Sequence, residues 1–384
     1  MATKKPVFDV AVVGAGVFGT WTAYWLRREG LKVALLDAYG PGNSRASSGG
    51  ESRIIRMGYG PDELYTRFSR RALGLWMEFC EETAAALFLR TGVLWLAKSK
   101  DQYTLDSLNT MRRMGIEAET LSPEELVKRF PQFSTHNVDW AVLEPHSGVL
   151  MARRAVQTVA IRAEELGVEY LRAVVEPPSG EKKLKTIRSS SGEVAAENFV
   201  FACGPWLGQV FAAELGRRIF VTRQEVFFFG APAGEGRFGP ETMPAWLHHG
   251  ENIYGLPDLE HRGVKFADDA HGGRAHPDTE ERIPEEEHTA AMSRYAARRF
   301  PALKGAPLVE ARVCQYENSS NGDFLIDRHP RMENVWLVGG GSGHGFKHGP
   351  AVGEYVRDRV LGRGEAEPRF SYESKATVQK RAVY

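Results

Sequence analysis

Apolar and polar positions occur along the chain in blocks that predict strands and helices in turn. Residues 8–13 form a short apolar run that ends in a glycine-rich turn, and residues 20–29 have the composition of a helix. A second apolar run over residues 32–36 closes on Asp37. Strand, glycine turn, helix and strand in this order predict a βαβ unit with parallel strands.

Similar blocks return further along the chain. Residues 152–166 are predicted to form a helix, and residues 168–175 a strand that rejoins the first sheet. Residues 219–229 are strongly β-type with an aromatic end, which suits a sheet over a pocket. The other expected elements are a loop over 44–60, helices over 61–86 and 104–114, a helix capped by Ser122, strands over 197–202, 312–316, 324–327 and 335–338, and a solvated helix start in the acidic run 280–287.

Composition and charge narrow the classes of function. The chain has 384 residues, of which 42% are hydrophobic and 26% charged, so it is long enough for two domains and too apolar to be mostly disordered. Its 49 basic residues match its 49 acidic residues, which argues against a nucleic-acid partner. The longest uncharged stretch, residues 10–26, is short and opens as a strand, so no membrane span is expected. The N-terminus lacks an apolar signal segment, and we expect a cytoplasmic protein.

Cysteine and histidine positions predict neither a disulfide framework nor a metal site. The three cysteines, Cys80, Cys203 and Cys314, are scattered and show no CxxC spacing. His248 and His249 are adjacent, and on a strand adjacent side chains point to opposite faces. We therefore expect no bound metal.

The first glycine turn has the spacing of a dinucleotide-binding motif. Gly14 would allow the tight turn, Gly16 would let the backbone approach a pyrophosphate, and Gly19 would let helix and strand pack closely. Asp37 would accept hydrogen bonds from both ribose hydroxyls, and it would repel a 2′-phosphate. The motif alone leaves FAD and NAD open.

Further motifs favour FAD. The sequence SSGGESRIIR at residues 47–56 resembles the flavin loop of the D-amino-acid-oxidase-like superfamily, in its monomeric sarcosine oxidase and N-methyltryptophan oxidase branch. Four more motifs resemble that branch in the same order: ACGPW at 202–206, RVCQY at 312–316, FLIDRHP at 324–330 and GHGFK at 343–347. The resemblance covers essentially the whole chain.

The resemblance implies an α/β chain, α+β overall, with two domains. A Rossmann-type FAD domain would comprise residues 1–85, 147–218 and 315–384. A substrate domain with a mostly antiparallel sheet would comprise residues 86–146 and 219–314.

The resemblance also implies the residues that bind FAD. Cys314 matches the cysteine that carries the flavin through a thioether, whereas Cys80 and Cys203 are expected to be structural. The cofactor-binding residues expected from the motifs are Gly14, Gly16, Val17, Phe18, Gly19, Asp37, Ser47, Ser48, Ser52, Arg53, Gly204, Trp206, Cys314, Gly341, Gly343, His344, Gly345 and Lys347.

Other matches imply the substrate site. Arg56 and Lys347 match the pair that holds the substrate carboxylate, a role that suits an Arg fork beside a Lys point charge. Lys265 matches the lysine that promotes reaction with oxygen, by stabilising the negative charge that develops there. The expected catalytic residues are Lys265, Arg53 and Tyr316, and the expected substrate-binding residues are Arg56, Lys347, Tyr254 and Asp269.

The chain also departs from the family pattern. Asp269 stands where sarcosine oxidases have a histidine, and Gly49 stands where members often carry histidine. A carboxylate changes the polarity of the pocket, which puts sarcosine itself in doubt as the substrate. Asp269 would suit a longer or cationic amine, for which it would be a counter-ion.

The expected activity is flavin-dependent oxidation of the C–N bond of a secondary or N-methyl amino acid by a monomer. The imine would hydrolyse, and O2 would be reduced to hydrogen peroxide. Three alternatives stay open: a flavin dehydrogenase that passes electrons to a quinone or protein partner, a non-catalytic flavin subunit of a complex, and a tRNA-modifying amine oxidase module.

Overall fold

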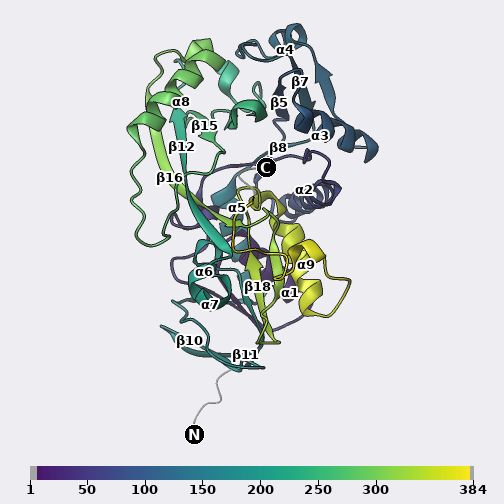
Figure 1. Ribbon diagram of the computed structural model, residues 1–384, viewed down its shortest axis with the longest axis vertical. Coiled ribbons are helices and arrows are strands. Elements are labelled where there is room, and N and C mark those ends of the chain that lie inside the picture. The colour runs from purple at the N-terminus through teal and green to yellow at the C-terminus, as the bar shows by residue number, and fades with distance from the viewer. Residues whose placement is uncertain (1–6, 381–384) are drawn as a thin grey trace.

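The computed structural model describes residues 7–380 and contains two main sheets (Figure 1). The first sheet has seven strands and lies in the lower half of the view, in the order β17-β18-β11-β1-β2-β9 with β10 paired to β11. The central strand β1 is parallel to both of its neighbours, β2 and β11. β2 is parallel to β9, and β11 is parallel to β18. The edge strand β17 is antiparallel to β18, and β10 is antiparallel to β11. The strands are β1 (Val7–Val13), β2 (Val33–Asp37), β9 (Glu169–Arg172), β10 (Thr186–Ser189), β11 (Gly192–Phe201), β17 (Leu325–Arg328) and β18 (Val335–Gly339).

The second sheet has eight strands in the order β16-β12-β15-β14-β13-β5-β7-β6 and occupies the upper half of Figure 1. Every neighbouring pair is antiparallel except β13 with β5. A small third sheet, β3-β8-β4, lies between the two. The strands are β5 (Val93–Ala97), β6 (Glu119–Leu121), β7 (Trp140–Glu144), β12 (Ile219–Phe229), β13 (Ala245–His248), β14 (Ile253–Leu256), β15 (Val264–Asp268) and β16 (Leu308–Ser319), with β3 (Arg53–Ile55), β4 (Phe88–Leu89) and β8 (Gly148–Leu150) in the third sheet.

Helices cover both faces of the parallel sheet because its strands are apolar on both sides. Val10, Val12 and Leu35 share one buried cluster with residues of α1, α5 and α9. Ala11 and Leu36 point the other way and pack with residues of α6 and α7. The helices are α1 (Val17–Arg28), α2 (Glu63–Thr83), α3 (Gln102–Arg113), α4 (Pro123–Arg129), α5 (Ala152–Glu165), α6 (Leu207–Val210), α7 (Ala212–Leu215), α8 (Glu286–Arg299) and α9 (Gly349–Val360).

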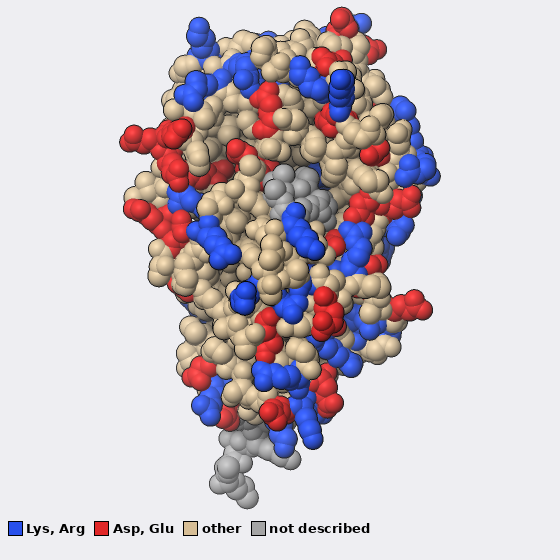
Figure 2. All heavy atoms as spheres, in the orientation of Figure 1, with Lys and Arg blue, Asp and Glu red and all other residues tan. Residues whose placement is uncertain are grey.

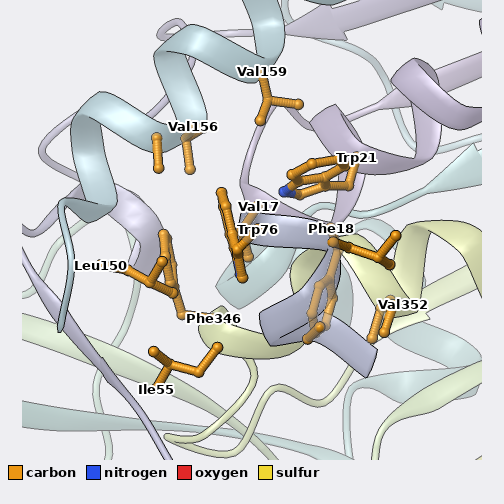
Figure 3. Close-up of a cluster of buried hydrophobic side chains, with 14 of the residues drawn as sticks. Val17, Phe18, Trp21, Ile55, Trp76, Leu150, Val156, Val159, Phe346 and Val352 are labelled. Carbon is orange, nitrogen blue, oxygen red and sulfur yellow. The ribbon is translucent and has the colours of Figure 1, made fainter. Parts of the chain in front are cut away.

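The core beside the glycine turn joins segments that are distant in sequence (Figure 3). Trp21 on α1 is 1% exposed and packs edge-on against Trp76 of α2, with ring centroids 5.1 Å apart. Phe346 stacks on Trp76 at 6.1 Å. These contacts hold the start of α1 against the segment that leads into α9, so the two glycine-rich loops face the same space.

Two glycines in the first motif are required by backbone contacts. Gly14 has a φ of +104°, and a Cβ there would lie 2.3 Å from the carbonyl oxygen of Ala202. A Cβ on Gly19 would lie 1.8 Å from the carbonyl oxygen of Gly14. By contrast, a Cβ on Gly16 would meet only the Ser48 hydroxyl at 3.5 Å, an ordinary contact. Backbone packing within the fold therefore requires glycine at positions 14 and 19. At Gly16 it does not, and the surface there is open to a ligand.

Most predicted elements are present with shifted ends, and the Ser122 helix has the full capping box. Three details differ. The predicted loop over 44–60 contains β3, because its residues pair with β8. The acidic run 280–287 mostly precedes α8, which begins at Glu286. β16 runs continuously across residues 314 and 315, the position where a domain boundary is expected.

Within residues 7–380 no helix is long and apolar enough to cross a membrane. On the face shown in Figure 2, basic and acidic side chains are interspersed. The prediction of a cytoplasmic location rests on the N-terminal segment, and residues 1–6 of that segment lie outside the described residues.

Candidate active site

One cavity extends from the end of β2 to the second glycine loop and brings together most of the expected cofactor residues. It runs between the carboxyl ends of parallel strands, where ligands of such sheets bind. The expected residues that line it are Gly14, Gly16, Val17, Phe18, Asp37, Ser47, Ser48, Arg53, Gly204, Trp206, Gly341, Gly343 and Gly345, together with Tyr316. Gly19, Ser52, Cys314, His344 and Lys347 lie outside this lining.

Asp37 and Ser48 support the glycine turn. One carboxylate oxygen of Asp37 accepts from the Ala15 N–H at 2.8 Å, and the other accepts from Tyr39 and Gly40 at 2.8 and 2.7 Å. The Ser48 hydroxyl accepts from the Val17 N–H at 3.1 Å, at the start of α1. Asp37 therefore lines the cavity and also holds the backbone of the glycine turn in place. The motif did not indicate this structural role.

Near Asp37 lies an aromatic and charged cluster of Tyr39, Arg45, Trp206 and Asp278, of which only Trp206 was predicted from the sequence as a site residue. The Arg45 guanidinium lies 4.4 Å from the centre of the Tyr39 ring and forms an ion pair with Asp278 at 3.2 Å. Trp206 donates to the same Asp278 carboxylate at 2.9 Å. Tyr39, Trp206 and Asp278 all line the cavity, so they form its wall near Asp37.

Arg53 lies at the other end of the cavity and is held by the loop that precedes it. Its guanidinium donates to the carbonyl oxygens of Ser52 and Ser47 at 2.7 and 2.6 Å. A Cβ on Gly50 would lie 2.3 Å from this guanidinium, so glycine makes room for it. Arg53 is thus a fixed, half-buried cation that lines the cavity.

Lys265 is buried against a carboxylate. Its Nζ atom lies 2.6 Å from Glu51 Oε1 and 3.2 Å from the carbonyl oxygen of Ser52, and the residue is 2% exposed. Burial lowers the pKa of Lys265, and the negative charge of Glu51 partly offsets that effect. Burial would raise the pKa of Glu51, but the attraction of Lys265 outweighs it and holds that pKa well below its usual range. Glu51 is therefore a carboxylate at neutral pH, and it is a site residue that the motif analysis did not assign.

Arg56 and Lys347 are brought together around Tyr59. The Arg56 guanidinium lies 4.6 Å from the centre of the Tyr59 ring, and Lys347 Nζ donates to the Tyr59 hydroxyl at 2.7 Å. Both side chains are buried, and burial, followed by the charge of Arg56, lowers the pKa of Lys347 well below its usual range. His348 Nε2 lies 2.7 Å from the same hydroxyl.

Glu144 is the carboxylate behind this pair, and sequence reasoning did not identify it. It accepts from the Met57 N–H at 2.7 Å, from Trp95 Nε1 at 2.8 Å and from the Ser147 hydroxyl at 2.5 Å. Its negative charge raises the pKa of Lys347 against burial. The hydrogen bonds to the Glu144 carboxylate come from neutral donors. Arg56 and Lys347 therefore do not form a direct ion pair with it, and they can bind another anion in the site.

Tyr316, Asp269 and Tyr254 form the wall next to the cations. The Tyr316 hydroxyl donates to Asp269 Oδ1 at 2.8 Å. Burial raises the pKa of Asp269, while the Tyr316 hydrogen bond and then Arg56 and Lys347 oppose the rise. Asp269 is thus within the electrostatic reach of both Arg56 and Lys347.

Cys314 and His344 lie at the edges of the site. Cys314 is half-buried on β16 opposite Gln224. Burial raises the pKa of its thiol, and the cations Arg53 and Lys265 oppose that rise. His344 is buried, and its ring nitrogens lie 3.2 Å from the Tyr59 hydroxyl and 3.0 Å from the carbonyl oxygen of Gly322.

The parallel sheet, its glycine turn and the cavity that ends at Arg53 are typical of a dinucleotide-dependent oxidoreductase. The chain belongs to the DAO family of FAD dependent oxidoreductases, whose profile matches residues 9–359. The expected family, α/β fold class and FAD dependence are confirmed.

Curated relatives match the chain over nearly its full length. It is 32% identical over 367 residues to peroxisomal sarcosine oxidase of Homo sapiens, with 93% of each chain covered. It is 31% identical over 387 residues to monomeric sarcosine oxidase of Bacillus sp. (strain NS-129), covering 98% of this chain and 99% of that protein. The fold matches L-proline dehydrogenase from P. horikoshii with a TM-score of 0.84 at 21% identity, covering 95% and 97% of the two chains.

Proposed function

We propose that the protein oxidises the C–N bond of a secondary or N-methyl amino acid and passes the electrons to O2. The observation that carries this proposal is the pair of buried cations, Arg56 and Lys347, around Tyr59 beside the Asp269–Tyr316 hydrogen bond. Two buried cations can bind a carboxylate strongly, and a carboxylate acceptor nearby can bind an amine. An amino acid has both groups.

In this proposal Arg56 and Lys347 hold the substrate carboxylate, and Asp269 and Tyr316 face the amine. When bound, FAD supplies the two-electron acceptor for the C–H bond next to nitrogen. The substrate loses two electrons and becomes an imine, which water hydrolyses to a carbonyl compound and an amine. O2 takes up the two electrons and two protons to give hydrogen peroxide, with the charge of Lys265 stabilising the negative charge that develops on oxygen.

The remaining expectations fit the same proposal. Residues 1–85, 147–218 and 315–384 would form the FAD domain around the parallel sheet, and residues 86–146 and 219–314 the substrate domain. The protein would act as a cytoplasmic monomer, with no nucleic-acid, membrane or metal partner.

The test is anaerobic bleaching of the flavin absorbance by a panel of sarcosine, longer N-methyl amino acids, proline, pipecolate and primary amino acids. We expect bleaching by a secondary or N-methyl amino acid. Because Asp269 faces the amine in this proposal, Asp269→Asn should weaken binding of substrates whose amine is cationic at least tenfold, and it should change binding of substrates whose amine is neutral by only a few-fold. Bleaching by no member would contradict the proposal, and bleaching without fast peroxide formation in air would select a dehydrogenase.

We also propose that FAD is attached to the protein through Cys314. Burial raises the pKa of the Cys314 thiol, but the neighbouring cations Arg53 and Lys265 oppose that rise and so favour the thiolate, which is the nucleophilic form of cysteine. Cys314→Ser should release all flavin into the supernatant after acid denaturation, whereas the parent protein and Cys80→Ser should retain it in the pellet. Flavin that stays with the Cys314→Ser protein would refute this attachment.

A further inference from the structure

Glu317 places a buried acid in the wall of the cofactor cavity, and the proposed chemistry does not use it. It follows Tyr316 on β16, is 6% exposed and lines the cavity together with Gly341 and Val338. Within residues 7–380 its Oε1 atom is buried without a hydrogen-bond partner. Buried polar atoms are usually paired, so an orphan atom in a ligand cavity indicates a group that pairs with the ligand.

The second glycine loop fixes this carboxyl group in place. The N–H groups of Gly340 and Gly341 lie close enough to the carboxyl to lower its pKa, and the Ser342 N–H donates to the Glu317 carbonyl oxygen at 2.8 Å. A Cβ on Gly339 would lie 2.2 Å from Oε1 and 2.7 Å from a methyl carbon of Leu207, so the acid packs closely against this glycine. Glu317 is thus part of the loop structure and cannot simply swing out to solvent.

The surroundings of Glu317 favour its neutral form. Burial raises the pKa of Glu317 to about 8, although the two loop N–H groups lower it. Val221 on β12 and Leu207 on α6 are apolar neighbours. The titratable group that faces it from the turn after β11 is Cys203, whose own pKa is raised by burial and then by Glu317 and Asp37.

We propose that Glu317 binds FAD as a protonated acid and donates its O–H to an oxygen atom of the cofactor. A neutral carboxyl supplies one donor, whereas a carboxylate supplies none. An ionised Glu317 would also lack a counter-ion beside a cofactor that carries a negative diphosphate. Bound FAD removes water from the cavity side of the residue, which disfavours the charged form further.

This proposal gives FAD affinity a defined dependence on pH. Below the pKa of the empty site, Glu317 is protonated in the free and bound proteins, so the affinity is constant. Above it, the free protein has lost the proton and must regain it on binding. The FAD dissociation constant should therefore rise roughly tenfold for each pH unit above about 8, with uptake of one proton.

The experiment titrates apoprotein with FAD from pH 6 to pH 10 in the Cys314→Ser background, where binding is reversible, and follows quenching of flavin fluorescence. We expect constant affinity up to about pH 8 and the tenfold rise per unit beyond it. Adding Glu317→Gln, which keeps a donor at every pH, should remove the break and leave affinity near pH 7 within a few-fold. The exposed control Glu333→Gln should retain the break.

Two further measurements test the protonation of Glu317 directly, so the conclusion does not depend only on the affinity of the Glu317→Gln variant. Mixing with FAD at pH 9 in a weak buffer with an indicator dye should report proton uptake by the parent and none by Glu317→Gln. Infrared difference spectra of the Cys314→Ser protein should show a protonated carboxyl band that disappears at high pH. A flat affinity profile, or the same break in Glu317→Gln, would overturn the proposal and would leave the proposed amine oxidation untouched.

Discussion

Replacing Lys265 with methionine should slow reoxidation of the reduced protein by O2 by roughly a hundred- to a thousandfold, the usual cost of removing one group that stabilises developing charge. Electron transfer to oxygen creates negative charge, and Lys265 is the buried cation that faces it in our proposal. Reduction of the flavin by substrate should change by only a few-fold, because Lys265 contacts Glu51 and Ser52 and not the carboxylate-binding pair. Stopped-flow measurement of the two half-reactions separates the effects.

Lys265→Met leaves Glu51 as a buried carboxylate without its ion-pair partner, and this should destabilise the folded protein. The double variant Lys265→Met with Glu51→Gln removes both charges, and it should fold better than the single variant and show the same slow reoxidation. Lys183→Met, at an exposed pair with Glu197, is the control and should react with O2 as the parent does. Fast reoxidation in the double variant would show that oxygen reacts without this cation.

Local motifs predicted the parts of the site that depend on backbone conformation. Gly14 adopts a positive φ in this turn, and Gly19 packs against the carbonyl oxygen of Gly14, so their spacing within one strand, turn and helix carries the information. The capped helix after Ser122 is local in the same sense. The motif residues Arg56 and Lys347 could also be proposed from the sequence, since each lies in a loop that resembles a known one.

The supporting carboxylates could not be predicted in this way. Glu144 contacts the Met57 and Gly58 N–H groups across a large sequence separation, and no periodic pattern links these positions. The same is true of Glu51 and Lys265, which come from a loop and from β15. Glu317 looks like an ordinary polar residue of a strand, and only the fold reveals that its carboxyl is buried behind a glycine loop. Charge compensation is a property of tertiary packing, so it appears only when the segments are assembled.

Replacing Arg56 with glutamine should weaken binding of amino-acid substrates roughly a hundredfold or more, since truncating one partner of a buried charge pair costs about 2–5 kcal/mol. Oxidation of an N-methyl amine without a carboxylate should be nearly unaffected. The comparison therefore tests the assignment of Arg56 to the carboxylate, and a general loss of activity with both substrate types would contradict it. The measurement is the apparent dissociation constant for anaerobic flavin reduction by each substrate.

Arg154→Gln is the matched control, because Arg154 is half-exposed and paired with Glu260, where an ion pair is worth little. Lys347→Met should show the same dependence on the carboxylate as Arg56→Gln. Since both cations contact Tyr59, we expect the two substitutions to be coupled, so that the double variant loses less affinity than the sum of the two single losses. Strictly additive losses would mean that Arg56 and Lys347 do not bind the same anion, and the carboxylate would then belong to only one of them.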